Sequence, residues 1–331
     1  MQDKIDFVIA WVDGSDKKWQ LEKEKYSGEK GEQTVNRYRE WGTLKYWFRG
    51  VEQYASWVNK IHFVTYGHLP DWLDTSHPKL NIVSHKDFIP KKYLPTFNAN
   101  PIELNFHRIP GLKENFVYFN DDMYIINPVK PDDFFIHNLP CDMAVLYPAY
   151  VNGYSTIFDH ILLNDSELFL RNFDIKPIIK RDWKKWLTLK YGKNLLKTLC
   201  MLPFPGFSQI MLTHQPASFK KTVFTEVWKV EENLLDEVCT HKFRTPGDVN
   251  QYIYRYWQLG TGKFYPYNII NRGSYVEVGA VYQNYEKVIV QEKKKLLCLN
   301  DANVVVDFNL ESQNMKAAFE RKMPKKSSFE R

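Results

Sequence analysis

The sequence has little cysteine, and its four cysteines, Cys141, Cys200, Cys239 and Cys298, lie far apart in a chain of 331 residues. None belongs to a C-x-x-C pair, which argues against a zinc ribbon or a thiol–disulfide redox motif. We therefore expect a reduced, cytoplasmic protein. Long apolar runs are also missing: no stretch of about 18 apolar residues occurs and the first residues lack a signal-peptide pattern, so we expect neither a membrane span nor secretion.

Several catalytic fingerprints are absent as well. The chain has no Walker loop and no G-x-G-x-x-G, which weakens kinase, GTPase and nicotinamide-enzyme interpretations. It has no H-E-x-x-H and no G-x-S-x-G, so a zinc protease or serine hydrolase has no support. The charge balance, 45 Lys and Arg against 39 Asp and Glu, gives only +6, which does not favour a nucleic-acid partner.

Aromatic residues are abundant, at 16% of the chain, within an otherwise ordinary globular composition of 44% hydrophobic residues. Aromatic side chains beyond the needs of a core often line sites for sugars, nucleobases or membrane interfaces. The length allows one large or two medium domains with a substantial core.

Apolar runs typical of strands alternate with a helical pattern in the first 135 residues. Strands are predicted at 5–12, 61–65, 80–84 and 116–119, and a helix with one apolar face at 44–58. This order predicts an α/β fold with a mostly parallel sheet flanked by helices. Residues 209–257 look helical, and 296–331 read as a strand followed by a polar helix.

Polar residues stand where these strands end. Ligands of parallel sheets bind outside the carboxyl ends of the strands, and Asp13, Gly67, His85 and Asp121 fall there. The strongest local signal is the run Asn120-Asp121-Asp122. Two adjacent carboxylates at a strand end suit a divalent cation bound with a diphosphate, whereas the alternative is a solvated turn or a helix cap.

Other candidates have equally simple structural explanations. Asp13-Gly14 can bind phosphate, ribose or a base, or form an ordinary turn. His214, in an irregular stretch, is a candidate general base. Arg244 can clamp a phosphate, although an ion pair with Asp248 explains it equally well. Glu103 is expected on a short helix at 103–107, where a solvated helix face is the alternative.

Four blocks, in order along the chain, resemble the Stealth family of sugar-phosphate transferases. They are IDFVIAWVDGSD at 5–16, a long block at 37–135 that includes FVYFNDDMYIINPVKPDDFF, THQP at 213–216 with HKFRTPGDVN at 241–250, and CLND at 298–301 with the tail 324–330. Members of this family include bacterial capsular polysaccharide phosphotransferases and the catalytic subunit of the lysosomal-enzyme N-acetylglucosamine phosphotransferase.

The resemblance implies transfer of a sugar-1-phosphate from a UDP-sugar to a hydroxyl of a glycan or lipid-linked oligosaccharide, with release of UMP. It also implies a Rossmann-like, glycosyltransferase-A-like catalytic domain and Mg²⁺ (or Mn²⁺) held by Asp121 and Asp122. The implied catalytic residues are His214, Arg244, Glu103 and Asp122, and the implied substrate-binding residues are Asp6, Trp11, Asp13, Gly14, Asn120, Asn250 and Asn300.

Two rival functions remain open: a conventional glycosyltransferase that releases UDP, and a polysaccharide-binding protein without chemistry. We expect the catalytic α/β domain at 1–149 and 206–331, with a helical insertion at 150–205. The basic, tryptophan-rich stretch 176–191 of that insertion predicts peripheral contact with the inner face of a membrane. The alternative is a helix whose tryptophans are packed and whose lysines are solvated.

Overall fold

The protein is built on a five-stranded sheet. The computed structural model describes residues 3–29, 31–32, 38–149, 153–206, 209–279, 281–302, 305 and 307–331. The strand order is β10-β4-β1-β2-β3, and every pair is parallel except β10 with β4. The strands are β1 (Ile5–Trp11), β2 (Ile61–Thr65), β3 (Leu80–Ser84), β4 (Asn115–Asn120) and β10 (Ala217–Lys220).

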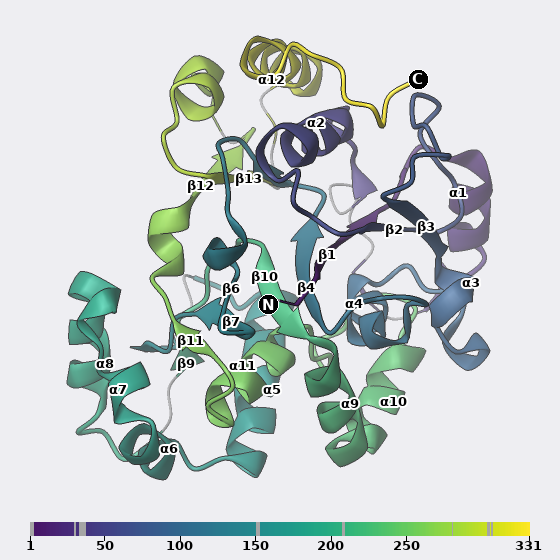
Figure 1. The fold of residues 1–331 in the computed structure, drawn as a ribbon. Coiled ribbons are helices and arrows are strands. Elements are labelled where there is room, and N and C mark those ends of the chain that lie inside the picture. Colours follow the sequence, from purple (N-terminus) through teal and green to yellow (C-terminus); the bar gives the residue numbers. More distant parts are fainter. Residues whose placement is uncertain are drawn as a thin grey trace.

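Helices cover both faces of this sheet (Figure 1). Alternate residues of β1 enter two different cores: Phe7 and Ile9 pack on the side of α2 and α12, and Val8 packs on the side of α4, α9, α10 and α11. This explains why β1 is apolar without a break from Phe7 to Trp11, as strands buried on both faces are. The bounds are α2 (Leu44–Tyr54), α12 (Phe308–Lys322), α4 (Ala99–Leu104), α9 (Lys221–Val230), α10 (Glu232–Thr240) and α11 (Tyr252–Gly260).

Smaller sheets and short helices complete the fold. One small sheet has the order β12-β13-β5, with β12 (Gly273–Val278), β13 (Leu296–Asp301) and β5 (Met123–Ile125); another is β11-β7-β6, with β11 (Tyr265–Pro266), β7 (Leu139–Asp142) and β6 (Phe135–Ile136). The remaining short elements are α1 (Lys17–Glu24), α3 (His85–Phe88), η2 (Lys91–Tyr93), η3 (Phe106–Arg108), η4 (Pro131–Asp133), η6 (Ile269–Arg272) and η7 (Glu286–Val290).

The C-terminal tail is tied to α2 by a buried arginine. The guanidinium of Arg49 donates to both oxygens of Glu330 at 2.8 and 2.9 Å and to Glu320 at 2.8 Å. Such a bidentate contact combines charge with fixed geometry. The tail 324–330, which the sequence singled out, therefore closes one side of the sheet's core.

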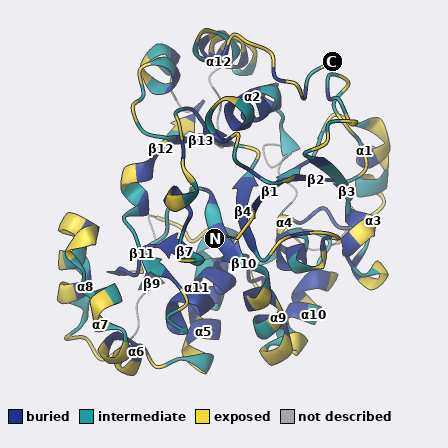
Figure 2. Cartoon of the chain, viewed as in Figure 1, coloured by how far each residue is buried: buried dark blue, intermediate teal, exposed yellow. Residues whose placement is uncertain are grey.

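The described part of 150–205 is mostly helical; that it forms an inserted subdomain stays a prediction. It contains α5 (Ile157–Asn172), α6 (Ile175–Arg181), α7 (Trp183–Trp186), η5 (Leu189–Asn194) and α8 (Leu195–Met201), and the flanking strands β8 (Leu146–Tyr147) and β9 (Gln209–Ile210) pair with each other. Trp186 and Tyr191, both completely buried, belong to an apolar cluster that this segment shares with β8, β9 and α11. Figure 2 shows buried residues in the central sheet and α11, and many exposed ones on α6 to α8.

The link between β2 and β3, residues 66–79, runs through turns that include Pro70 and Pro78. One local expectation is corrected. The helical pattern expected over 209–257 is wrong in its first part, where β9 and β10 form; pairing with the edge of β4 decides the conformation there. No helix in the described ranges is both long and apolar enough to cross a membrane.

Candidate active site

The acidic run predicted from the sequence forms the tight turn between β4 and β5. Asn120 is the last residue of β4, and Met123 begins β5. A neighbouring strand holds this turn, since Leu299 of β13 donates its backbone N–H to the carbonyl of Asp122 at 2.9 Å. The two carboxyl groups are thus fixed at the carboxyl edge of the parallel sheet, as expected.

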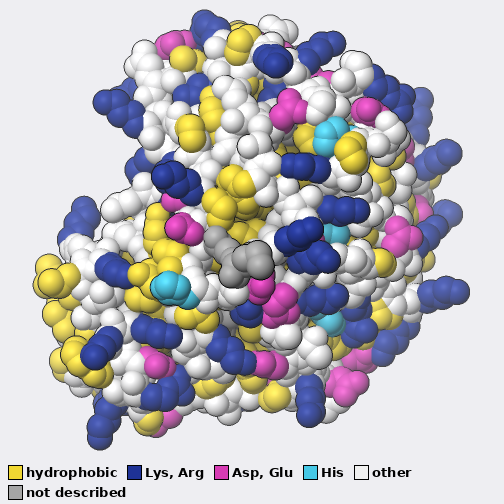
Figure 3. Space-filling view, in the orientation of Figure 1, with side chains coloured by type: hydrophobic (Ala, Val, Ile, Leu, Met, Phe, Trp, Pro, Cys, Tyr) yellow, Lys and Arg dark blue, Asp and Glu magenta, His cyan; other side chains and the backbone are white. Residues whose placement is uncertain are grey.

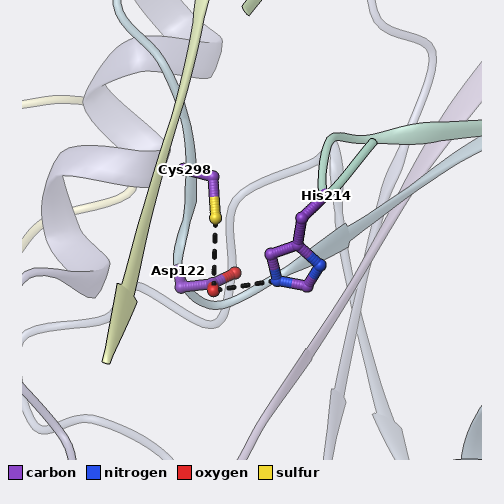
Figure 4. A group of neighbouring side chains, drawn as sticks. All are labelled: Asp122, His214 and Cys298. Atoms are coloured by element: carbon purple, nitrogen blue, oxygen red, sulfur yellow. Dashed lines mark hydrogen bonds and ion pairs between the residues drawn. The ribbon is translucent and has the colours of Figure 1, made fainter. Parts of the chain in front are cut away.

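Asp122 joins two side chains that are far away in the sequence (Figure 4). Its Oδ2 lies 3.1 Å from Nε2 of His214 and 3.4 Å from Sγ of Cys298 on β13. Burial and the charge of Asp122 raise the pKa of Cys298 well above its usual value, so this cysteine is a thiol that donates to Asp122. The other carboxylate oxygen of Asp122, Oδ1, is buried and has no hydrogen-bond partner among the described residues.

His214 lies in the loop between β9 and β10, and its neighbours are anchored to η6 and β12. Arg272 donates to the carbonyl of Pro216 at 3.0 Å, and the amide of Gln215 donates to the carbonyl of Gly273 at 3.2 Å. Burial is the largest single effect on His214 and lowers its pKa, but the charge and hydrogen bond of Asp122, together with the charges of Glu103 and Asp121, raise the pKa overall. The same contact keeps the pKa of Asp122 low despite its burial.

Glu103 is a buried acid rather than a solvated residue. It lies on α4, is only 7% exposed, and accepts a hydrogen bond from the hydroxyl of Tyr118 on β4 at 2.9 Å. Burial raises the pKa of Glu103 to about 6, against the opposing effects of Tyr118 and of the positive charges of Arg244 and His214. Because the charges of Arg244 and His214 both act on Glu103, these three residues belong to one charged region.

The loop that carries Arg244 is held by Asp248, which is completely buried. Its carboxylate accepts hydrogen bonds from Asn98 and Asn100 at 2.8 Å each, from Thr245 at 2.7 Å and from the ring of His241 at 2.6 Å. A carboxylate is needed at this position because it can accept all four hydrogen bonds. Whether Asp248 also serves as the counter-ion of Arg244 stays a prediction.

A divalent cation fits the oxygen atoms of the acidic turn. Desolvation by the surrounding protein and the charges of Asp122 and Glu40 raise the pKa of Asp121 to about 7. Part of this residue remains accessible to solvent. Buried side-chain oxygens of Asn120 and Asp122 have no partner among the described residues. Mg²⁺ prefers such oxygen ligands, whereas the neighbouring trio of Asp122, His214 and Cys298, with donor atoms within 4.8 Å, includes a protonated thiol.

A pocket of about 870 Å³ opens beside this turn. Its walls include the predicted residues Trp11, Asp13 and Gly14, together with the cations Lys23 and Arg39, and also Glu40, whose charge acts on Asp121. Gly14 is required by close packing, since a Cβ atom there would lie 2.0 Å from the carbonyl oxygen of Tyr38. The volume is within the usual range of about 300–1,000 Å³ for small-molecule sites.

Comparison with known proteins identifies the family. Conserved region 1 of the Stealth proteins matches residues 3–31, and conserved region 2 matches residues 37–141. A capsular polysaccharide phosphotransferase, WcwK of Streptococcus pneumoniae, is 41% identical over 100% of both chains. The chain belongs to the Stealth family.

Other relatives carry similar names. The receptor polysaccharide phosphotransferase WefC of Streptococcus gordonii is 39% identical over 100% of both chains. The exopolysaccharide phosphotransferase cps2G of Lactiplantibacillus plantarum is 38% identical over 99% of this chain and 96% of its own. The resemblance read from the sequence is thereby confirmed, and this Stealth protein is a phosphotransferase of the bacterial type.

Three predicted binding residues of the Stealth protein make no hydrogen bond to Asp122 or His214 among the described residues, although Asn300 directly follows Leu299, which bonds to the backbone of Asp122. Asp6 is near the opposite end of β1, completely buried, and accepts hydrogen bonds from Asn59, His62 and the backbone of Lys113 at 2.7, 3.0 and 2.9 Å. Asn250 caps the approach to α11 by accepting from Tyr252 at 2.9 Å, and Asn300 stands near the end of β13. The contacts of Asp6 are those of a structural acid, and its role in binding stays a prediction.

Some residues of the site were not foreseen. Tyr118 shares a face of β4 with Asn120, so the two-residue period of a strand was the signal available for it. Glu40 and Cys298 stood inside the blocks that carried the Stealth resemblance, but nothing local to either residue points to the acidic turn. Their proximity to it arises from tertiary packing alone.

Proposed function

We propose that this Stealth phosphotransferase moves a hexose- or N-acetylhexosamine-1-phosphate from a UDP-sugar to a hydroxyl of a glycan acceptor during synthesis of a cell-surface polysaccharide. The observation that carries the proposal is the hydrogen bond of 3.1 Å between His214 and Asp122 beside the acidic turn. The names of the relatives, which speak of capsular, receptor and exopolysaccharide phosphotransferases, support the polysaccharide as acceptor.

In this proposal, one nitrogen of His214 carries out the proton transfer. Because Nε2–H donates to Asp122, Nδ1 is left to accept the proton of the acceptor hydroxyl. The hydroxyl oxygen then forms a bond to the β-phosphorus, and the bond from that phosphorus to the bridging oxygen breaks. UMP leaves with the bridging oxygen, and the proton stays on His214.

The other charged residues neutralise and orient the phosphates. Arg244 would face the phosphate oxygens and neutralise their charge. The carboxylate of Glu103, on which the positive charge of Arg244 acts, would hold the guanidinium in place. Mg²⁺ bound by Asp121 and Asp122 would neutralise diphosphate charge and favour departure of UMP. Lys23 in the wall of the large pocket would offer a cation to the phosphates of a nucleotide donor, although the acids Asp13, Glu24, Glu40 and Asp71 also line this pocket and Arg39 is paired with Asp301. The parallel sheet with an acidic turn after β4 also supports the glycosyltransferase-A-like assignment that we propose for the fold.

The test is product analysis with UDP-sugars, a glycan acceptor and Mg²⁺, using phosphorus NMR and mass spectrometry. We expect UMP and a phosphodiester, with activity lost in Asp122→Asn and His214→Gln and on chelation of the metal. The matched controls are Asp132→Asn and His160→Gln, which change exposed residues elsewhere. UDP with a glycosidic bond would mean a conventional glycosyltransferase, and turnover that survives both active-site changes would refute the assigned roles.

We further propose that the enzyme works in the cytoplasm at a membrane surface. In the stretch 176–191, Trp186 is buried, as the packing interpretation holds, but Trp183 is 54% and Leu189 86% exposed. Figure 3 shows hydrophobic side chains gathered near the left edge, over the region of α7 and α8, with Lys and Arg around them. Exposed apolar groups ringed by cations suit an anionic lipid surface.

Liposome flotation tests this contact. Wild-type protein should float with anionic vesicles and much less with neutral ones, and Leu196→Ser with Leu199→Ser, both exposed on α8, should weaken flotation. Leu21→Ser removes an equally exposed leucine from α1 and is expected to change nothing. Equal flotation of all three proteins, or none, would refute the membrane contact.

A further inference from the structure

A second pocket, of about 600 Å³, lies apart from the donor pocket and is strongly basic. It is formed by β11, η6 and the residues before β13, with one residue from η5 of the insertion. Five cations line it and no acidic residue does: Lys190, Arg272, Lys293, Lys294 and Lys295. The two pockets share no lining residue.

Most of this positive charge is not neutralised by the protein. Lys295 is paired with Asp133 at 2.6 Å, but Lys190 donates to the hydroxyl of Tyr265 at 2.8 Å, and Lys294 donates to the carbonyl of Gly273 at 3.1 Å. Among the described residues, only Lys295 of the five cations makes an ion pair.

One acid stands close by. The carboxylate of Glu292 accepts hydrogen bonds from Ser274 at 2.7 Å and from the backbone N–H groups of Lys293 and Lys294 at 2.8 and 2.9 Å, and its charge offsets one cation. Asp133, paired to Lys295, and Glu292 together offset two of the five cations. The pocket therefore keeps about three positive charges in excess, which favours binding of an anion.

Arg272 makes the pocket more than a patch of surface lysines. It is only 4% exposed, and it donates to the carbonyls of Asp133 at 2.6 Å and of Pro216 at 3.0 Å. Its Nε has no hydrogen-bond partner among the described residues. The charges of Asp133 and Asp142 act on Arg272, but these carboxylates are paired with Lys295 and Arg255. A buried guanidinium that shares its counter-ions with other cations is costly, so an anion bound in the pocket would help to neutralise it.

The pocket is coupled to the catalytic loop. Arg272 holds the carbonyl of Pro216, two residues after His214, and the adjacent Gly273 holds the amide of Gln215. An anion bound to Arg272 would therefore contact the residue that also anchors the loop of His214, the proposed base. In the proposed function the nucleotide donor occupies the pocket of about 870 Å³ beside the acidic turn. The anion that binds in the second pocket therefore belongs to the acceptor.

We propose that this basic pocket binds a phosphate group of the acceptor, either a phosphodiester within the growing glycan or the diphosphate of a lipid-linked oligosaccharide. The assignment of the ligand to the acceptor rests on the proposed function. The volume accommodates a diphosphate with one sugar, and the rings of Tyr265 and Tyr267 in its wall offer flat surfaces for that sugar.

Binding is measured without turnover, by calorimetry with inorganic pyrophosphate and the metal-free enzyme saturated with UDP to block the donor pocket. We expect one site whose affinity falls at least tenfold in Lys190→Ala with Lys293→Ala, both exposed and so tolerant of change. Lys229→Ala, exposed on α9, is the control and should bind normally. No binding beside UDP, or equal binding by all three proteins, would overturn the proposal.

Acceptor kinetics separate the two sources of phosphate. The double variant should raise the KM for a phosphate-bearing acceptor at least tenfold, leave its KM for UDP-sugar unchanged, and have little effect on an acceptor without phosphate. A raised KM only with diphosphate-linked lipid identifies the lipid, and one with soluble phosphodiester glycan identifies the polymer. If neither KM changes, the site does not serve the acceptor. If pyrophosphate binds but the enzyme transfers no sugar phosphate, the anion site stands and the proposed function is contradicted.

Discussion

Replacing Glu103 by Gln should stabilise the protein and abolish its activity. The pKa of Glu103 is raised from 4.5 to about 6 in the fold, chiefly by burial. A carboxyl with a raised pKa destabilises the folded state above that pKa, and the penalty disappears below the unfolded value. A shift of about 1.5 units corresponds to about 2 kcal/mol. Glu103→Gln keeps an oxygen that can accept from Tyr118, so it should remove this penalty.

Urea unfolding at two pH values tests the sign as well as the size. Glu103→Gln should be more stable than wild type by about 2 kcal/mol at pH 8 and nearly equal to it at pH 4.5, with the difference appearing between pH 4.5 and 6. The control, Glu167→Gln on the exposed face of α5, should show no such change. A variant less stable than wild type at pH 8, or a difference independent of pH, would refute the electrostatic reasoning.

Two further predictions concern the loops around the site. Asp248→Ala leaves four donors without their acceptor and should cost about 3 kcal/mol or more, measured by urea unfolding, whereas the exposed Asp132→Ala should change stability by less than about 0.5 kcal/mol; equal stability of the two would contradict the network. Gly14→Ala forces the loop after β1 away from Tyr38 and should weaken UDP binding in calorimetry at least tenfold, while Gly28→Ala, where a Cβ meets nothing within 4 Å, should bind normally; unchanged affinity in Gly14→Ala would remove that loop from the donor site.

The parallel strands and their polar ends were predictable because their signals are local. An apolar run followed at once by Asp121 and Asp122 indicates both the strand and the edge of the sheet where a ligand binds. In contrast, β10 is four residues long, and its pairing with β4 decides its conformation.

The active site could be assembled from the sequence only through the family resemblance. Asp122 and His214 are 92 positions apart, and they meet because the loop between β9 and β10 is anchored by Arg272. No periodicity predicts such a meeting. The burial that sets the pKa of Glu103 is likewise a property of packing on Tyr118, which a short helical pattern does not contain.

The fate of the β-phosphorus of the donor tests the central claim most directly. A UDP-sugar labelled at that phosphorus is incubated with the enzyme, a glycan acceptor and Mg²⁺, and the label is followed by phosphorus NMR and chromatography. We predict that the label moves to the glycan as a phosphodiester while unlabelled UMP is released. Label that stays in UDP, with the sugar joined through a plain glycosidic bond, would contradict the account.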